Sequence, residues 1–186
     1  MVAAWKFENE AGSQYDSHKG DDISLEHLQD LGILYWRLDA DHYDNDAKLR
    51  SIREERHYKN SDICKIFPEM PHFEDKSRLF FEEHLHDDEE IRMILEGSGY
   101  FDVRDSDDTW IRVHVEKDDM IIVPAGLYHR FTLDRNLFAT ALRVFQDNPC
   151  WIAQARAKIE AAHLPSASRE HYLQRLSLKR QHVYAI

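Results

Sequence analysis

The sequence predicts a mostly β protein, an antiparallel β-barrel of jelly-roll type with several peripheral α-helices. Two observations predict this class. Residues 104–109 form a polar, acidic hairpin tip flanked by alternating runs, and helical spacing appears on both sides of residues 80–145. Within 80–145, seven short runs are rich in β-branched and aromatic residues and end at Gly, Asp, Asn or Pro: residues 80–86, 91–97, 99–105, 109–117, 119–125, 128–134 and 138–146.

Upstream of this region the chain predicts elements of mixed type. Residues 1–20 are polar with little periodicity, and we expect them to wrap the surface. Ser24 is expected to cap the first turn of a short helix that ends before Gly32. The remaining elements are a strand, a helix, a short apolar run and a helix, at residues 32–39, 46–58, 63–67 and 73–80.

After Pro149 the pattern is helical again, and Ser168 is expected to cap a helix over residues 169–180. A chain of 186 residues is long enough for one sizeable core and short for two domains. We therefore expect a single domain over residues 1–186. Its barrel core is predicted at residues 80–145, with helical and wrapping segments at residues 1–79 and 146–186.

Composition restricts the partners. The formal net charge of −11 disfavours binding to nucleic acid or to an anionic membrane surface. No apolar run approaches the roughly 18 residues of a membrane span, so no membrane insertion is expected. Cys64 and Cys150 form no CxxC pattern, and the first ten residues have no signal-peptide core. These features predict an intracellular monomer with unpaired thiols, cytoplasmic and alternatively also nuclear.

The segment EEHLHDDEEIRMILEGSG, residues 82–99, predicts a site. Side chains alternate between the faces of a strand, so in a continuous strand His84, His86, Glu90 and Arg92 share one face. Imidazole nitrogen and carboxylate oxygen are ligands for iron, nickel and manganese. The alternative is an acidic surface turn that happens to contain histidine. Alternation from residue 80 to 95 and the stop at Gly97 favour the metal site.

A second segment, DDMIIVPAGLYHRFTLD, supplies another histidine. Its apolar strand enters a Pro-Ala-Gly turn that reverses the chain and brings His129 back towards the first cluster. Phe131 has the same parity as His129, so it is expected to line the same pocket. The other nine histidines have no such setting, and we expect them on the surface or satisfied in the core: residues 18, 27, 42, 57, 72, 114, 163, 171 and 182.

These two segments resemble the two cupin motifs, HxHxxxE followed by Gly97 and PxGxxH at residues 124–129. The resemblance to the acireductone dioxygenase family of cupins is closer still. It extends over EEHLH, EEIRMILEGSGYFDVRD, WIRV, PAGLYHRFTLD and ALRVF, and upstream to LGILYWRLDAD. It covers most of residues 1 to about 155 and implies a cupin-type barrel.

The resemblance also implies an activity and its residues. His84, His86, Glu90 and His129 would bind one ion per chain, Fe²⁺ or alternatively Ni²⁺. Arg92 would pair with the anionic substrate, acireductone, which reacts with O₂, and Arg143 would act near the same pocket. Phe80 and Phe131 would be apolar walls.

The sequence departs from the family pattern at three positions. Asp87 stands where a small or apolar residue is usual, Asp118 where a glycine is usual, and Arg78 where the first cupin glycine is expected. Asp tolerates a left-handed conformation better than most residues, which reduces the significance of the second departure. No part of the motif set lies beyond about Ile159.

Two other functions compete with this one. A different cupin dioxygenase would share the metal ligands and differ in the pocket around Arg92 and Phe131, so turnover of acireductone discriminates. A non-enzymatic metal-binding or interaction protein would be indicated by a defective ligand set. All four candidate ligands are present in this sequence.

Overall fold

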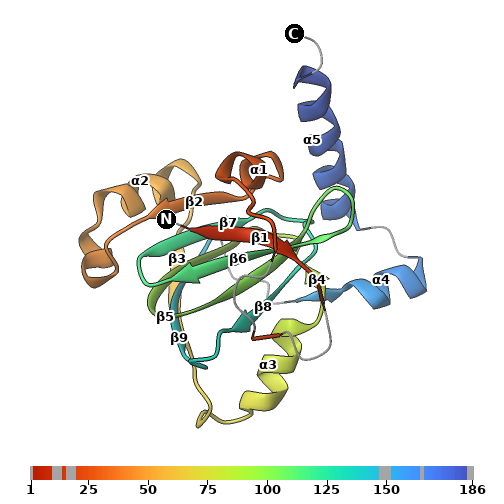
Figure 1. Ribbon diagram of the computed structural model, residues 1–186. Helices are drawn as coiled ribbons and strands as arrows, with labels where there is room; N and C mark the ends of the chain where they lie inside the picture. The colour runs from red at the N-terminus through yellow and green to blue at the C-terminus, as the bar shows by residue number, and fades with distance from the viewer. Residues whose placement is uncertain (1, 10–13, 16–19, 147–151, 164–165, 184–186) are drawn as a thin grey trace.

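The computed structural model describes residues 2–9, 14–15, 20–146, 152–163 and 166–183, with only the backbone for residues 180–183. Ten strands dominate the chain, and helices lie on the periphery (Figure 1). The mostly β class predicted from the sequence is confirmed. The strands are β1 (Ala3–Phe7), β2 (Leu34–Arg37), β3 (Asn60–Ile66), β4 (His84–Leu85), β5 (Glu90–Arg104), β6 (Trp110–Glu116), β7 (Asp119–Val123), β8 (His129–Leu133), β9 (Ala139–Phe145) and β10 (Gln154–Ala155).

Five α-helices and one 3₁₀ segment complete the described chain: α1 (Leu25–Asp30), η1 (Ala40–Asn45), α2 (Ala47–Glu55), α3 (Phe73–Phe81), α4 (Arg156–Ala162) and α5 (Ala167–Val183). The predicted cap of α1 is confirmed, because Ser24 Oγ accepts a hydrogen bond from the His27 amide at 3.2 Å. Gly32 follows with φ of +87°, the left-handed conformation that ends a helix. Asp46 caps α2 by accepting from the Leu49 amide at 2.8 Å.

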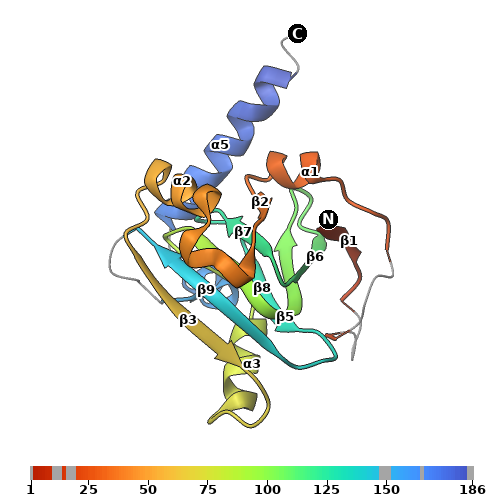
Figure 2. The ribbon, with the colours of Figure 1, turned by 90° about the vertical axis from the view of Figure 1, so that its left-hand side faces the viewer.

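The long strand β5 belongs to two groups of strands at once, one of six strands and one of five, each counted with β5. Residues 98–104 of β5 pair with β6 and β8, and this group continues to β1 on one side and to β4 and β10 on the other. Residues 90–97 pair with β7 and β9, which β2 and β3 extend. All pairings are antiparallel. The two groups form the opposed layers seen in Figure 2.

Two hydrophobic clusters hold helices to these strands. One brings Ile94, Phe101 and Ile121 together with Leu28 of α1 and Tyr172 of α5. The second packs residues of η1 and α2 on β5, β7 and β9, with Met93, Met120 and Val144 among its fully buried members. Among the described residues, no helix is long and apolar enough to cross a membrane.

Several boundaries differ from those predicted. Residues 3–7 form strand β1, which pairs with β6 and buries Ala4, Trp5 and Phe7, instead of wrapping the surface. Strands β2 and β3 also join the sheet, so the strands extend beyond the predicted core of residues 80–145. Pairing with a long neighbouring strand satisfies the backbone of these segments, and their own composition does not reveal that partner.

Two further differences concern a helix and its cap. Helix α3 continues to Phe81, so the predicted strand over residues 80–86 is reduced to β4. The residue that caps α5 is Ser166, whose Oγ accepts from the Arg169 amide at 3.3 Å. The prediction of Ser168 as the cap was wrong, since its hydroxyl instead donates to Asp87. Cys64 is a free thiol, and Cys150 lies outside the described residues.

The expected stop at Gly97 is also corrected. Strand β5 runs through residues 97–99, but its pairing with β9 shifts register between Ile94 and Glu96. Gly97 has φ of +73°, and a Cβ atom there would lie 2.1 Å from the carbonyl oxygen of Phe138. The glycine therefore marks a bulge within one strand, the site where β5 passes from one group of strands to the other.

Replacing Gly97 with Ala is expected to lower the free energy of unfolding by about 1–3 kcal/mol, because the side chain meets backbone and its φ is strained. Urea denaturation monitored by circular dichroism measures this change. Ser106→Ala, at the exposed hairpin tip, is the control and should shift stability by less than about 0.5 kcal/mol. Equal stability of Gly97→Ala and the wild type would contradict the bulge as a required feature.

Candidate metal centre

Strand pairing brings the first two histidines together. His84 of β4 is the partner of His129 of β8 in the antiparallel register, and Ala155 of β10 flanks His84 on the other side. The imidazole centroids of His84 and His129 lie 4.6 Å apart. Both side chains are buried. The predicted return of His129 to the first cluster is therefore achieved through a β-ladder.

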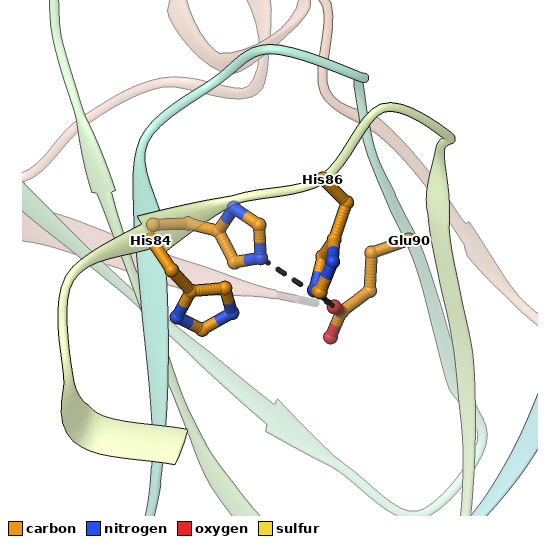
Figure 3. Close-up of side chains that lie close together, drawn as sticks. His84, His86 and Glu90 are labelled. Carbon is orange, nitrogen blue, oxygen red and sulfur yellow. Dashed lines mark ion pairs between the residues drawn. The ribbon is translucent and has the colours of Figure 1, made fainter. Parts of the chain in front are cut away.

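His86 and Glu90 lie at the two ends of a short loop. The predicted continuous strand through residues 84–90 is wrong, because β4 ends at Leu85 and β5 begins at Glu90. The loop nevertheless returns the carboxylate to the histidines, as Figure 3 shows for His84, His86 and Glu90. Glu90 Oε2 lies 3.1 Å from His86 Nε2 and 3.4 Å from His129 Nε2.

The four side chains form a metal-binding arrangement. One potential ligand atom from each of His84, His86, Glu90 and His129 lies within 4.8 Å of the others. Among the residues that the structure describes, no other group of His, Cys, Asp and Glu side chains has this geometry. Three imidazole nitrogens and one carboxylate suit divalent iron, nickel or manganese.

The hydrogen bonds behind the rings select the metal-binding tautomer. The Nδ1 atoms of His84, His86 and His129 lie 2.6, 3.2 and 2.8 Å from backbone carbonyl oxygens of Glu82, Ile152 and Leu127. A carbonyl only accepts, so each Nδ1 must carry the proton, and each Nε2 keeps its lone pair free. His129 Nε2 is buried without a hydrogen-bond partner in the described structure. This orphaned acceptor fits a bound cation.

The electrostatics of His84 and Glu90 agree with metal binding. At His86, burial acts to lower the pKa, but the hydrogen bond and the charge of Glu90 outweigh it and raise the pKa. Burial, assisted by the neighbouring His129, lowers the pKa of His84 to about 4, so this imidazole is neutral at neutral pH. Burial opposes ionisation of Glu90, but Arg92 and the histidines outweigh it and hold its pKa well below the ordinary value. A neutral imidazole and an ionised carboxylate are the forms that bind a metal ion without first losing a proton.

Arg92 lies beside the ligands without occupying a ligand position. Its Nη2 is 3.4 Å from Glu90 Oε1, and its Nη1 donates to the Ile91 carbonyl at 2.9 Å. The side chain is mostly buried, and burial lowers its pKa from the ordinary value while Glu90 opposes that shift. The structure thus places a guanidinium at the edge of the four-ligand group, on the side of Glu90.

Arg143 lies next to Arg92 in the sheet. The two residues are register partners on β9 and β5. Asp62 of β3 accepts two hydrogen bonds from Arg143, at 2.7 Å from Nε and 2.6 Å from Nη2. This bidentate pair orients the guanidinium and offsets one of two adjacent positive charges.

Phe80 and Phe131 meet in a small apolar cavity. They come from α3 and β8 and share the cavity with neighbours that include Ile66, Phe73 and Leu137. Its volume is about 10 Å³, close to that of one water molecule. The two predicted wall residues are therefore brought together, but the space between them is nearly closed.

The site also depends on charged residues that the sequence patterns did not single out. Glu83, beside His84, accepts from Arg104 at 2.9 Å and from Arg156 at 2.8 Å. Burial opposes ionisation of Glu83, yet the two arginines lower its pKa. The network anchors β4 to the hairpin tip and to α4, and no local pattern in the sequence links these segments.

Two of the loop's carboxylates are held away from the ligands. Glu89 binds Arg56, and it accepts from Tyr58 Oη at 2.5 Å. Asp87 accepts hydrogen bonds from Gln154 and Ser168. These partners leave Glu90 as the carboxylate that faces the histidines.

The fold and the site together define a class, a mostly β antiparallel protein with one buried His₃Glu metal centre. The ARD/ARD′ family model matches residues 3–153 of this sequence. The chain belongs to this family.

Curated relatives agree with that assignment. The chain is 51% identical over 160 residues to acireductone dioxygenase of Macaca mulatta, covering 84% of this chain and 89% of the relative. It is 47% identical over 179 residues to acireductone dioxygenase 1 of Arabidopsis thaliana, covering 94% of this chain and 87% of the relative.

A solved structure supports the fold. Acireductone dioxygenase from Bacillus anthracis, with a cadmium ion in its active centre, superposes with a TM-score of 0.66 at 24% identity. The match covers 82% of this chain and 97% of the bacterial one. The mostly β fold is shared with this structure, but the ten strands form one sheet that does not close into the predicted barrel.

Replacing His129 with Ala should weaken metal binding by more than roughly tenfold, since losing a ligand costs at least as much as losing an outer partner. Elemental analysis of the purified protein measures the retained metal. His114→Ala is the matched control, because this histidine lies on β6 outside the group. Full metal content in His129→Ala would contradict the four-residue centre.

Proposed function

We propose that this protein is an acireductone dioxygenase of methionine salvage. It would cleave 1,2-dihydroxy-3-keto-5-methylthiopentene with O₂. Fe²⁺ would give formate and 4-methylthio-2-oxobutanoate, and Ni²⁺ would give formate, carbon monoxide and 3-methylthiopropanoate. The observation that carries the proposal is the convergence of His84, His86, Glu90 and His129 in a member of this family.

The chain's contribution begins with the ligand set. The three Nε2 atoms and the Glu90 carboxylate would hold Fe²⁺ or Ni²⁺. Besides these four protein ligands, the bound ion would take the two oxygens of the substrate enediolate. A bound divalent cation would supply Lewis acidity that favours the ionised form of the substrate. The same N/O donors serve both metals, so geometry and availability decide between them.

We assign Arg92 the task of holding the substrate anion. Its guanidinium lies 3.4 Å from Glu90, so an anion placed against the ligands would lie close to its positive charge. A charge-assisted hydrogen bond is strong in a site with little water. Arg143 would support this task by its position beside Arg92, while Asp62 orients it.

We assign Phe80 and Phe131 to the wall that receives the methylthio group. The cavity between the two rings is mostly apolar, which suits a thioether, although none of the four metal-site residues lines it. A cavity of about 10 Å³ does not hold that group, so one of the two rings must rotate when substrate binds. Since Phe80 lies on α3 at the surface of the sheet, its ring has more room to move than a ring on a central strand.

Activity is tested on metal-free protein loaded separately with Fe²⁺ and Ni²⁺. Acireductone is added without oxygen, and O₂ is then admitted. The dissolved products are identified by NMR, and carbon monoxide is measured by gas chromatography. We expect formate from both forms and carbon monoxide from the Ni²⁺ form alone. A protein that binds the metal stoichiometrically and leaves acireductone unchanged beyond the uncatalysed rate would refute the proposed reaction.

Arg92→Ala should leave metal content intact and lower kcat/KM by roughly one to two decades, since a lost charge-assisted hydrogen bond costs about 1.5–3 kcal/mol. Arg92→Lys should recover part of the loss, because a point charge replaces a planar fork. Steady-state kinetics and elemental analysis are measured in parallel. The control is Arg50→Ala, an exposed arginine on α2.

Unchanged turnover in Arg92→Ala would remove Arg92 from the mechanism. Loss of metal together with loss of activity would make its role structural, through its contact with Glu90.

A further inference from the structure

Asp87, the residue after the ligand His86, is tied to the C-terminal part of the chain. Its Oδ2 accepts from Gln154 Nε2 at 2.7 Å, and its Oδ1 accepts from Ser168 Oγ at 2.8 Å. Gln154 belongs to β10 and Ser168 to the first turn of α5. We name these three residues the C-terminal latch. Both carboxylate oxygens of Asp87 are thus engaged by partners far away in the sequence.

His86 itself has two more attachments to the same part of the molecule. Its Nδ1 donates to the Ile152 carbonyl at 3.2 Å, just before β10. Its own carbonyl accepts from the Gly126 amide at 3.0 Å. The ligand is therefore held through its ring, through its backbone, and through the side chain of the next residue.

Helix α5 is seated where the latch requires it. Gly126 has φ of +78°, and a Cβ atom there would lie 2.2 Å from the carbonyl oxygen of Ser168. Arg169 Nη1 donates to the Gly126 carbonyl at 3.1 Å, and the buried Tyr172 donates to the Leu31 carbonyl at 3.0 Å. The helix start is fastened to the body, while its far end projects from it (Figure 1).

The loop between β4 and β5 has few other restraints. Residues 86–89 take part in no strand, so apart from the backbone hydrogen bond of His86 to Gly126 their conformation depends mainly on side-chain contacts. Glu89 is held from the side of α2 by Arg56 and Tyr58. Asp87 is held from the opposite side by the latch. The two ties pull non-ligating carboxylates outward and leave His86 and Glu90 facing inward.

We propose that Asp87 is a positioning residue for the metal centre, and that the latch sets the orientation and retention of His86. Ser168 and the start of α5 are then parts of the metal site, although the matched family region ends at residue 153. A ligand held in its binding orientation loses less entropy on metal binding, which raises affinity without a new contact to the ion. The proposal rests on metal binding at the four-residue centre and is independent of the substrate.

The test uses the full chain stripped of metal, with Co²⁺ alone as the probe. Affinity is measured by competition with a fluorescent chelator, and release is measured by dilution into excess chelator. Asp87→Ala should weaken Co²⁺ binding by about tenfold, as outer partners of metal ligands do, mainly through faster release. Ser168→Ala keeps the carboxylate and should reproduce part of this loss.

The matched control is Asp88→Ala, which removes an exposed carboxylate from the same loop. Within the described residues, Asp88 has no side-chain hydrogen bond or ion pair recorded, so affinity should change by no more than about twofold. The double change Asp87→Ala with Ser168→Ala should bind Co²⁺ no more weakly than Asp87→Ala, since the two residues act through one hydrogen bond. Equal losses at Asp87 and Asp88, or fully additive losses at Asp87 and Ser168, would overturn the latch.

A rescue separates positioning from general stability. Asp87→Asn keeps an oxygen that accepts from Gln154 and gains an amide that donates to the Ser168 hydroxyl, so it should retain most of the Co²⁺ affinity that Asp87→Ala loses. The visible absorption of bound Co²⁺ should change in Asp87→Ala and stay near that of the wild type in Asp87→Asn. A lower melting temperature of the metal-free protein with unchanged Co²⁺ affinity and spectrum would show that Asp87 only stabilises the fold. Failure of the wild type to bind Co²⁺ would overturn the centre and the latch together.

Discussion

The constraint on which the structure depends is that one strand, β5, serves two groups of strands. Its 15 residues pair with β7 and β9 in the first half and with β6 and β8 in the second. This sharing is possible because the bulge before Gly97 and the positive φ of that residue let the strand change direction. Glu90 and Arg92 lie in the first half, whereas His129 belongs to a strand paired with the second half. The centre therefore lies where the two groups converge, and its ligands come from both.

In the metal centre, burial disfavours the charged forms of the side chains, and the neighbouring groups decide which charges persist. Burying Glu90 disfavours its charge, and the nearby Arg92 and imidazoles compensate. Burying His84 disfavours its protonated form, which leaves a neutral ring. Backbone carbonyls of Glu82, Leu127 and Ile152 accept from the Nδ1 atoms, which leaves the Nε2 atoms of the three rings as the potential ligands. The three Nε2 atoms and the Glu90 carboxylate all carry lone pairs, and one divalent cation would interact with all of them at once.

The sequence predicted most of the strands between residues 90 and 145, most of the helices and the four residues of the metal centre, because period-2 patterns and the spacing of histidines are local signals. It did not predict β1. The four residues of the metal centre were predicted for a partly wrong reason. The prediction assumed that alternate residues of one continuous strand share a face, but a loop separates Leu85 from Glu90. The sequence predicted Glu90 as the ligand but not how Asp87 and Glu89 are held away from the histidines, since that depends on distant partners such as Arg56 and Ser168. The substitution of Asp118 for glycine was tolerated as expected, with φ of +78° and a hydrogen bond from the Ala40 amide.

The four consecutive carboxylates of residues 87–90 show how the loop presents only one carboxylate, that of Glu90, to the histidines. Like charges so close together repel one another, and the loop has no strand pairing to oppose that repulsion. Each is directed differently: Asp87 to Gln154 and Ser168, Asp88 to solvent, Glu89 to Arg56 and Tyr58, and Glu90 to the histidines and Arg92. Separation of the carboxylates reduces the repulsion, and a cation beside Glu90 reduces it further. Metal binding and loop conformation are therefore coupled, and the residues that orient the non-ligating carboxylates contribute to metal affinity without touching the ion.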